Sequence, residues 1–185
     1  MINLLGVLLL TTFPASPAQQ LLASGVVRPY GDEDAESREV FSRPVSLPSN
    51  VTMPADYDDL IDAMLRTSPT FRAQCTRIAH ASQLHIVVQR SLGAPPQSAL
   101  THLVRQGDRL DANVEIGLFG DVVLLIAHEF EHIIEQLDGV NLTAMADRSG
   151  TGVRTDPRTG QFETDRAVAV GQRVAHEVSR AVVRR

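Results

Sequence analysis

The chain has 185 residues, 43% of them apolar, which suits one folded domain with a hydrophobic core. All 17 basic residues are arginine, and the formal charge of −5 is spread without long blocks of one sign. Because no basic run offers a surface to a phosphate backbone, no nucleic-acid partner is expected. The single cysteine, Cys75, rules out an internal disulfide, and its apolar neighbours predict a core residue rather than a nucleophile.

The N-terminal segment has the composition of a secretory signal peptide. An apolar run at 4–10 is followed by a proline and several small residues. This run is too short to span a membrane as a helix. We therefore expect residues 1–18 to be removed on export, leaving a periplasmic or secreted protein without stable membrane insertion. Residues 19–54 carry several prolines and no sustained periodicity, which indicates an extended lead-in to a domain at 55–185.

The first part of this domain is predicted to be helical. Apolar residues recur at helical spacing from 55 to 66. Ser68 and Pro69 then form a typical N-cap and first turn, which predicts a second helix that ends at about Ala81.

Three strand-like segments follow the predicted helices. The segment 84–89 is β-branched and bounded by turn-forming residues, so it predicts a strand. The segments 100–104 and 110–118 flank a turn around Gly107, and this spacing indicates a hairpin.

A long apolar helix is predicted at 121–138, with Gly139 in the place of a left-handed cap. The segment 141–160 is polar and rich in turn-forming residues. A last helix is predicted from near Glu163 to about Val183. This order of helices, a small sheet, the apolar helix and a final helix predicts an α+β fold in one domain.

The apolar helix contains the pattern H-E-x-x-H at His128, Glu129 and His132. Two histidines four positions apart lie on one helix face, so both rings can reach one metal ion at about 2.0–2.1 Å. Glu129 is rotated from that face by roughly a quarter turn, which places its carboxylate beside such an ion as a base. Burying these side chains without partners would cost several kcal/mol, so a bound metal fits the apolar surroundings.

Besides Asp138 at its end, three other acidic residues belong to the same helix. Asp121 and Glu135 share the histidine face at neighbouring turns, where a carboxylate could accept a hydrogen bond from an imidazole or simply be solvated. Glu131 points away from that face and is expected to be exposed.

The sequence from His128 to His132 resembles the HExxH helix of the zincin metallopeptidases. The metzincin branch would require glycine at position 135 and histidine or aspartate at 138, and this chain has Glu135 and Asp138. Without that glycine, Asp138 would lie too far along a straight helix to reach the same ion.

The gluzincin branch takes its third ligand, a glutamate, from a later helix, so the resemblance implies that Glu163 completes the metal site. In a helix that includes Glu163, this residue falls on the inward apolar stripe, whereas Asp165 falls on the polar side. The gluzincin pattern Glu-x-x-x-Asp has Ala167 at its last position here. The carboxylate that supports a histidine would then be Asp165, Asp121 or Glu135.

The resemblance implies a zinc-dependent peptidase with one zinc ion per chain, held by His128, His132 and Glu163. Glu129 would take a proton from the metal-bound water and pass it to the leaving amine. A peptide or protein substrate is implied, paired along a sheet edge for which 110–118 is the expected strand.

The sequence offers four candidates for one catalytic group and two alternative functions. The group that would stabilise the oxyanion is one of four candidates, namely Tyr57, His85, His102 and His176. The alternative functions are a zinc-binding or interaction protein of the cell envelope that hydrolyses nothing, and a structural domain without metal.

Overall fold

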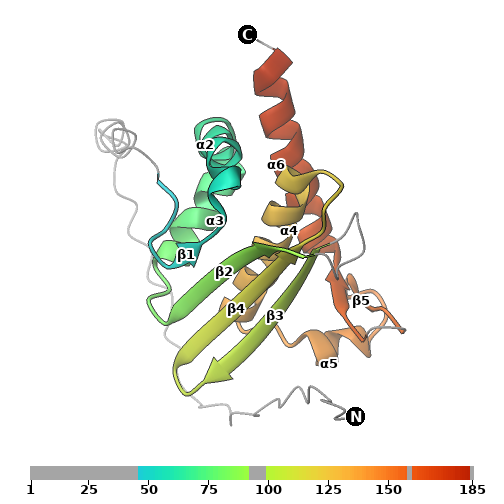
Figure 1. The fold of residues 1–185 in the computed structure, drawn as a ribbon. Coiled ribbons are helices and arrows are strands. Elements are labelled where there is room, and N and C mark those ends of the chain that lie inside the picture. The colour runs from blue at the N-terminus through green and yellow to red at the C-terminus, as the bar shows by residue number, and fades with distance from the viewer. Residues whose placement is uncertain (1–45, 92–98, 158–159, 184–185) are drawn as a thin grey trace, which may run out of the picture. The chain divides into compact units, whose positions relative to one another are not determined.

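The structure, a computed structural model, describes residues 46–91, 99–157 and 160–183. Within these ranges the chain forms five α-helices, a four-stranded sheet and a two-stranded sheet, and the predicted α+β fold is confirmed (Figure 1). The predicted signal peptide and most of the predicted lead-in lie outside the described residues. In the described part, no helix has the length and apolar character needed to cross a membrane.

The larger sheet has the strand order β1-β2-β4-β3. Its strands are β1 (Val51–Thr52), β2 (Leu84–Arg90), β3 (Ala99–Gln106) and β4 (Arg109–Ile116). The first two strands and β4 run parallel, and β3 pairs antiparallel with β4. Gly107 has a φ of 60° at the turn between β3 and β4, which confirms the predicted hairpin.

Among the described residues, β1 and β3 are the two edge strands of this sheet, so the expectation that the segment 110–118 forms the edge is wrong. Strand β4 pairs with β2 on one side and with β3 on the other. The parallel pairing joins Leu84 to Leu110, which are far apart in the chain. A local sequence pattern cannot predict such a pairing.

The sheet also takes in residues from the segment predicted as an extended lead-in. Val51 is buried in the core, and β1 pairs with β2. The side-chain amide of Asn50 donates to the carbonyls of Ile78 and Leu84, at 3.0 and 3.1 Å. The described fold therefore begins before residue 55.

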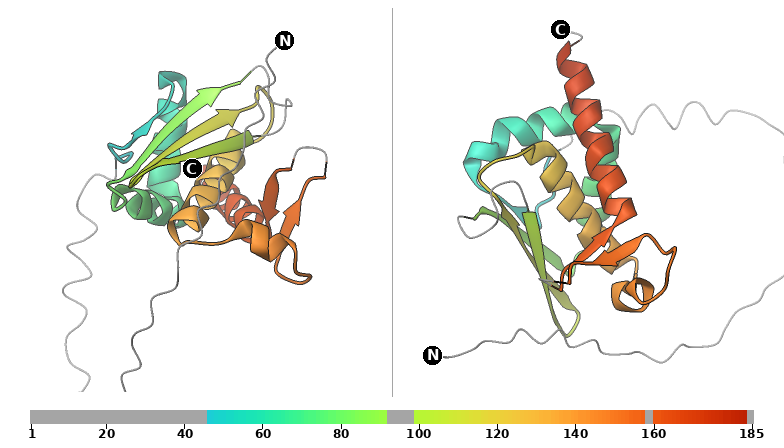
Figure 2. Two further views of the ribbon diagram at one scale, coloured as in Figure 1. Left: turned by 90° about the horizontal axis from the view of Figure 1, so that it is seen from below. Right: turned by 90° about the vertical axis from the view of Figure 1, so that its right-hand side faces the viewer.

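Helix α4 (Val122–Leu137) packs on one face of the larger sheet, against β3 and β4, and the right-hand view of Figure 2 shows it beside the sheet. Residues on β2 and β4 alternate between this covered face and the opposite one. The covered face joins the helices in one core, whose largest fully buried side chains include Phe71, Ile86, Ile116, Ile126 and Phe130. Cys75 is buried in the same core, as predicted.

The α-helices of the described part are, in chain order, α2 (Asp58–Thr67), α3 (Pro69–Ala79), α4 (Val122–Leu137), α5 (Leu142–Ala146) and α6 (Asp165–Val183). A short 3-10 helix at Ala55–Tyr57 leads into α2. The Ser68 side chain accepts a hydrogen bond from the backbone N–H of Phe71, which confirms the predicted N-cap of α3. The short helix α5 was not predicted, because its five residues are too few to show a periodicity.

The last helix begins at Asp165, so the prediction that it includes Glu163 is wrong. Glu163 lies on the short strand β6 (Phe162–Thr164), which pairs antiparallel with β5 (Val153–Thr155). Strands of three residues are too short for an alternating pattern to reveal them in the sequence. The Thr164 hydroxyl accepts from the backbone N–H of Ala167 at 2.9 Å, which satisfies a free donor in the first turn of α6.

Helix α6 runs back along α4 at very close range. A Cβ added to Gly171 would lie 3.0 Å from the backbone oxygen of Leu124 and 3.2 Å from the Cβ of His128. Both neighbours belong to the rigid frame of α4, so they cannot turn away as the end of a flexible side chain could. Glycine is therefore the residue that lets α6 approach α4 at the level of His128.

We expect Gly171→Ala to destabilise the protein. Alanine favours a helix over glycine by about 1 kcal/mol, but overpacking against a rigid helix costs roughly 1–3 kcal/mol. Urea unfolding of the metal-free protein measures the net change. Ala169→Gly, at an exposed position of the same helix, serves as the matched control because it changes helix propensity without a steric contact. A gain of about 1 kcal/mol in Gly171→Ala would contradict the close packing.

Candidate metal centre

His128 and His132 lie one turn apart on the face of α4 that meets α6. Their Nε2 atoms are 3.1 Å apart, and the rings meet edge to face with centroids 4.8 Å apart. Both side chains are mostly buried, with 13% and 12% exposed. The pattern H-E-x-x-H therefore directs both ring nitrogens at one point, as its spacing predicts.

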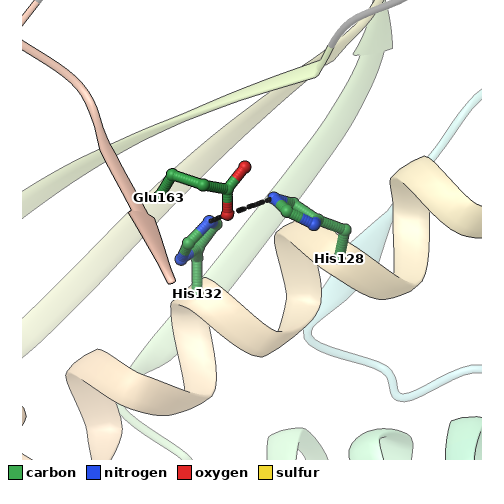
Figure 3. Close-up of side chains that lie close together, drawn as sticks. All are labelled: His128, His132 and Glu163. Atoms are coloured by element: carbon green, nitrogen blue, oxygen red, sulfur yellow. Dashed lines mark hydrogen bonds and ion pairs between the residues drawn. The ribbon is translucent and has the colours of Figure 1, made fainter. Parts of the chain in front are cut away.

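Glu163 reaches the same point from β6, as Figure 3 shows. Its Oε1 atom lies 3.4 Å from Nε2 of His128 and 3.7 Å from Nε2 of His132. The same oxygen accepts a hydrogen bond from the backbone N–H of Thr164 at 2.8 Å, which holds the carboxylate toward the histidines. Glu163 thus lies beside both histidines as expected, although it comes from a strand and not from a helix.

These three side chains form a group that could hold a metal ion. One ligand atom from each lies within 4.8 Å of the other two. Two imidazole nitrogens and one carboxylate oxygen are a donor set that suits zinc, and three protein ligands leave a fourth position open. The donor set and its convergence therefore fit the predicted ion, whose binding stays a prediction.

Glu135 contacts both His132 on α4 and Thr164 at the end of β6. Its Oε2 atom lies 3.0 Å from Nδ1 of His132, and its Oε1 accepts from the Thr164 hydroxyl at 2.7 Å. A carboxylate in this position orients the ring so that Nε2 points at the metal position. Of the three acids considered for this role, Glu135 is the one that contacts a histidine, whereas the Asp121 side chain caps the N-terminus of α4.

The carboxylates around His132 favour its protonated form when no metal is bound. Burial alone would lower the pKa of His132, but the contacts with Glu135 and Glu163 and the nearby charge of Glu129 raise it to about 9. Burial would likewise raise the pKa of Glu163, yet its contact with His132 and the charge of His128 lower it. A metal cation would replace this proton among the same carboxylates.

Glu129 lies beside the centre and faces the sheet. Its residue is 5% exposed, and its Oε2 atom accepts a hydrogen bond from the Thr101 hydroxyl at 2.6 Å. Burial raises the pKa of Glu129, and the opposing effects of Thr101 and the two histidines offset this only in part. A buried carboxylate with a raised pKa, next to a metal position, is suited to accept a proton from water.

Glu131 is buried, so the expectation that it is exposed is wrong. Its Oε1 atom accepts from the Arg166 guanidinium at 2.6 Å, and its Oε2 accepts from the Gln74 side chain at 2.8 Å. Glu131 does face away from the histidines, as its helical phase predicts. That face is covered by α3 and the start of α6, and the sequence alone could not show this cover.

The other two acids considered as metal ligands have other partners. Asp138 ends α4, where it pairs with Arg77 at 2.8 Å and with Arg166 at 3.2 Å. These two arginines lower the pKa of Asp138, and the hydrogen bond from Arg77 is the larger cause. Asp165 is exposed and pairs with Arg154 at 2.8 Å.

The four candidates for an oxyanion-stabilising group lie away from this centre. Tyr57 is buried in the core, with the Arg90 guanidinium over its ring. His102 follows Thr101 on β3 and therefore faces the opposite side of the sheet, and His85 is exposed between buried neighbours on β2. His176 is exposed on α6. No oxyanion-stabilising group is therefore assigned.

Three residues that build this centre were not singled out by the sequence. Thr101 and Thr164 come from strands, and each holds a glutamate of α4. No spacing rule connects them with the motif, because these contacts are set by the tertiary fold. For Gly171 a signal existed, since it lies four residues after Ala167 on the inward stripe of α6.

The chain was also compared with known proteins. No family model, curated protein sequence or solved structure matches it. The resemblance to the zincins therefore rests on the motif helix and on the side chains that surround it.

We expect the metal-free protein to lose stability as the pH rises from about 6.5 to about 9. His132 has a folded-state pKa raised from 6.5 to about 9. Its protonation therefore stabilises the fold fully below pH 6.5, and this contribution is lost as the pH passes the folded value. Urea unfolding across this range, with a chelator present, measures the change.

His132→Gln is the control, because it removes the titrating ring. Its free energy of unfolding should therefore change little with pH over this range. Equal pH dependence in both proteins would contradict the assignment. Since metal binding must displace the same proton, metal affinity should rise over the range in which stability falls.

Proposed function

We propose that this protein is a zinc-dependent hydrolase that cleaves peptide bonds. The observation that carries the proposal is the convergence of His128, His132 and Glu163 on one point. A carboxylate that could act as a base, Glu129, lies one position along the helix from the first histidine. A purely structural domain would have no need for two buried imidazoles that share one point with a carboxylate.

Each side chain has a defined part in this reaction. Zinc at the three ligands would supply Lewis acidity to a water molecule and to the scissile carbonyl. Glu129 accepts the proton of the attacking water and delivers it to the leaving amine, which is a base and then an acid role for one carboxyl group. Glu135 keeps the His132 ring oriented while this happens.

The open edge of β3 supports a peptide as the substrate. Strand β3 runs beside α4, and Thr101 on this strand touches Glu129. An extended peptide that pairs with β3 would make backbone hydrogen bonds, and its carbonyl groups would pass the base and the metal position. In the part of the chain that the structure describes, the outer side of β3 pairs with no strand. Such an edge recognises main chain and not a particular side chain, so it favours peptides over other hydrolysable substrates.

The environment of Glu129 favours an enzyme over a zinc-binding protein that hydrolyses nothing. A carboxylate without a catalytic part would be stabilised most simply by a cation, as Glu131 is by Arg166. Glu129 instead receives one neutral hydroxyl donor and keeps a raised pKa.

Export is a further part of this proposal. It is supported by the N-terminal segment, which has the composition of a secretory signal peptide.

We expect the purified protein to bind one zinc ion per chain, and His128→Ala or His132→Ala to abolish binding. Glu163→Ala should weaken it strongly, because one of three ligands is lost. Native mass spectrometry and a metal titration against a competing chelator measure this. Asp165→Asn is the matched control, since that exposed carboxylate lies two residues from Glu163 and should not affect the ion. Wild-type protein that binds no zinc, even when zinc is added, would refute the proposal.

We expect Glu129→Gln to retain zinc and to lose hydrolysis by at least about 100-fold, because the amide has the same shape but accepts no proton. A peptide-library digest with and without chelator identifies a cleaved peptide, on which the variant is then measured. Glu115→Gln is the matched control, since Glu115 also accepts from a hydroxyl, that of Ser91 at 2.7 Å, away from the histidines. Equal rates for Glu129→Gln and wild type would leave zinc binding in place and remove the catalytic assignment.

A further inference from the structure

We propose that Thr101 is a positioning residue that holds the base, Glu129, in place for proton transfer. The inference rests on the proposed function of the same site. Its observation is the 2.6 Å hydrogen bond from the Thr101 hydroxyl on β3 to the Oε2 atom of Glu129 on α4. This contact joins an edge strand of the sheet to the helix that carries the motif.

The bond fixes one oxygen of the carboxylate and leaves the other one available. Within the described part of the chain, no second hydrogen-bond donor reaches Glu129. With Oε2 held by Thr101, the carboxylate cannot rotate freely, and Oε1 is the oxygen that can accept a proton from water. A base held in one orientation reacts faster than one that samples several.

A comparison with the other two buried glutamates of α4 shows that this partner is unusual. Glu131 is held by a guanidinium and an amide, and Glu135 by an imidazole and a hydroxyl. Glu129 has a single neutral donor. The hydroxyl of Thr101 also lowers the pKa of Glu129, but by less than burial raises it. The positive charge of an arginine would stabilise the ionised form much further and make it a poorer base.

The residue type at position 101 suits this part. Threonine is branched at Cβ, so its hydroxyl has few orientations on a strand. Valine has nearly the same shape and favours strands equally, but it lacks the donor. If Thr101 served only to fill space beneath α4, valine would replace it without loss.

The position on β3 adds a link to the substrate. A peptide paired with this edge would lie against the strand whose inner face carries Thr101. Binding at the edge and the orientation of the base would then depend on the same strand, so that a bound peptide finds the carboxylate already aligned.

The test compares Thr101→Val with Thr101→Ser, both in the zinc-loaded full-length protein. Thr76→Val is the matched control, because the Thr76 hydroxyl also makes an internal hydrogen bond, to the Arg72 carbonyl at 2.9 Å, on the exposed side of α3. Should Thr101→Val not fold, Thr101→Ala removes the same hydroxyl without adding a methyl group.

The first readout is a crystal structure of each variant, which needs no activity. We expect the Glu129 carboxylate to keep its place in wild type, Thr101→Ser and Thr76→Val, and to turn away or become disordered in Thr101→Val. Zinc affinity should be unchanged in all of them, because Thr101 touches no metal ligand. A Glu129 carboxylate that keeps its orientation in Thr101→Val would overturn the proposal.

The second readout is kinetic, on a peptide that the wild type cleaves. We expect Thr101→Val to lower kcat roughly 10- to 100-fold with little change in KM, and Thr101→Ser to recover most of the rate. In a Glu129→Gln background, Thr101→Val should have almost no further effect, since Thr101 acts only through that side chain. Independent, additive losses would overturn the proposal.

These readouts separate the two proposals. A wild type that binds zinc but cleaves no peptide refutes the proposed function, and the crystal structures still decide whether Thr101 holds Glu129. If the wild type hydrolyses peptides and Thr101→Val hydrolyses them equally well, the inference is refuted and the proposed function stays intact.

Discussion

Helix α6 lies against α4 with Gly171 at a point of close contact, and the candidate centre forms where α4 meets β6, the strand that leads into α6. Because Gly171 carries no side chain, the start of α6 comes close enough for Thr164 to donate to Glu135 and for Glu163 to reach both histidines. The strand that carries Glu163 is in turn joined to the helix by the hydroxyl of Thr164 at its N-terminus. Because Thr164 joins β6 to the first turn of α6, a displacement of α6 from α4 would also act on the strand that carries Glu163.

The apolar helix α4 carries three buried glutamates, and each one has partners on other elements. Glu129 is bound to β3, Glu131 to α3 and α6, and Glu135 to the end of β6. A buried carboxylate without a partner costs several kcal/mol, so these acids favour the one arrangement in which all of them are paired. The charges that serve the proposed chemistry therefore also determine how the surrounding elements are placed.

Glu163 lies beside both histidines as predicted, but a strand and not a helix places it there. Helical phase placed this residue on an inward stripe, but the helix begins at Asp165 and the residue belongs to a three-residue strand. The inward stripe of α6 is confirmed, since Ala167 and Val174 are fully buried. Glu163 still lies on the side of α6 that faces α4, because β6 ends at Thr164 and α6 begins at the next residue.

The sequence by itself determined the longer helices, the strands of the larger sheet except β1, and the shared direction of His128 and His132. These features follow from local rules, namely apolar periodicity, an N-cap and the geometry of one helical turn. Only the tertiary structure decided that β3 is an edge strand, that Glu131 is covered, and that Thr101 holds Glu129. Each of these depends on contacts between residues far apart in the chain, and such pairings leave no mark on the local pattern from which a sequence is read.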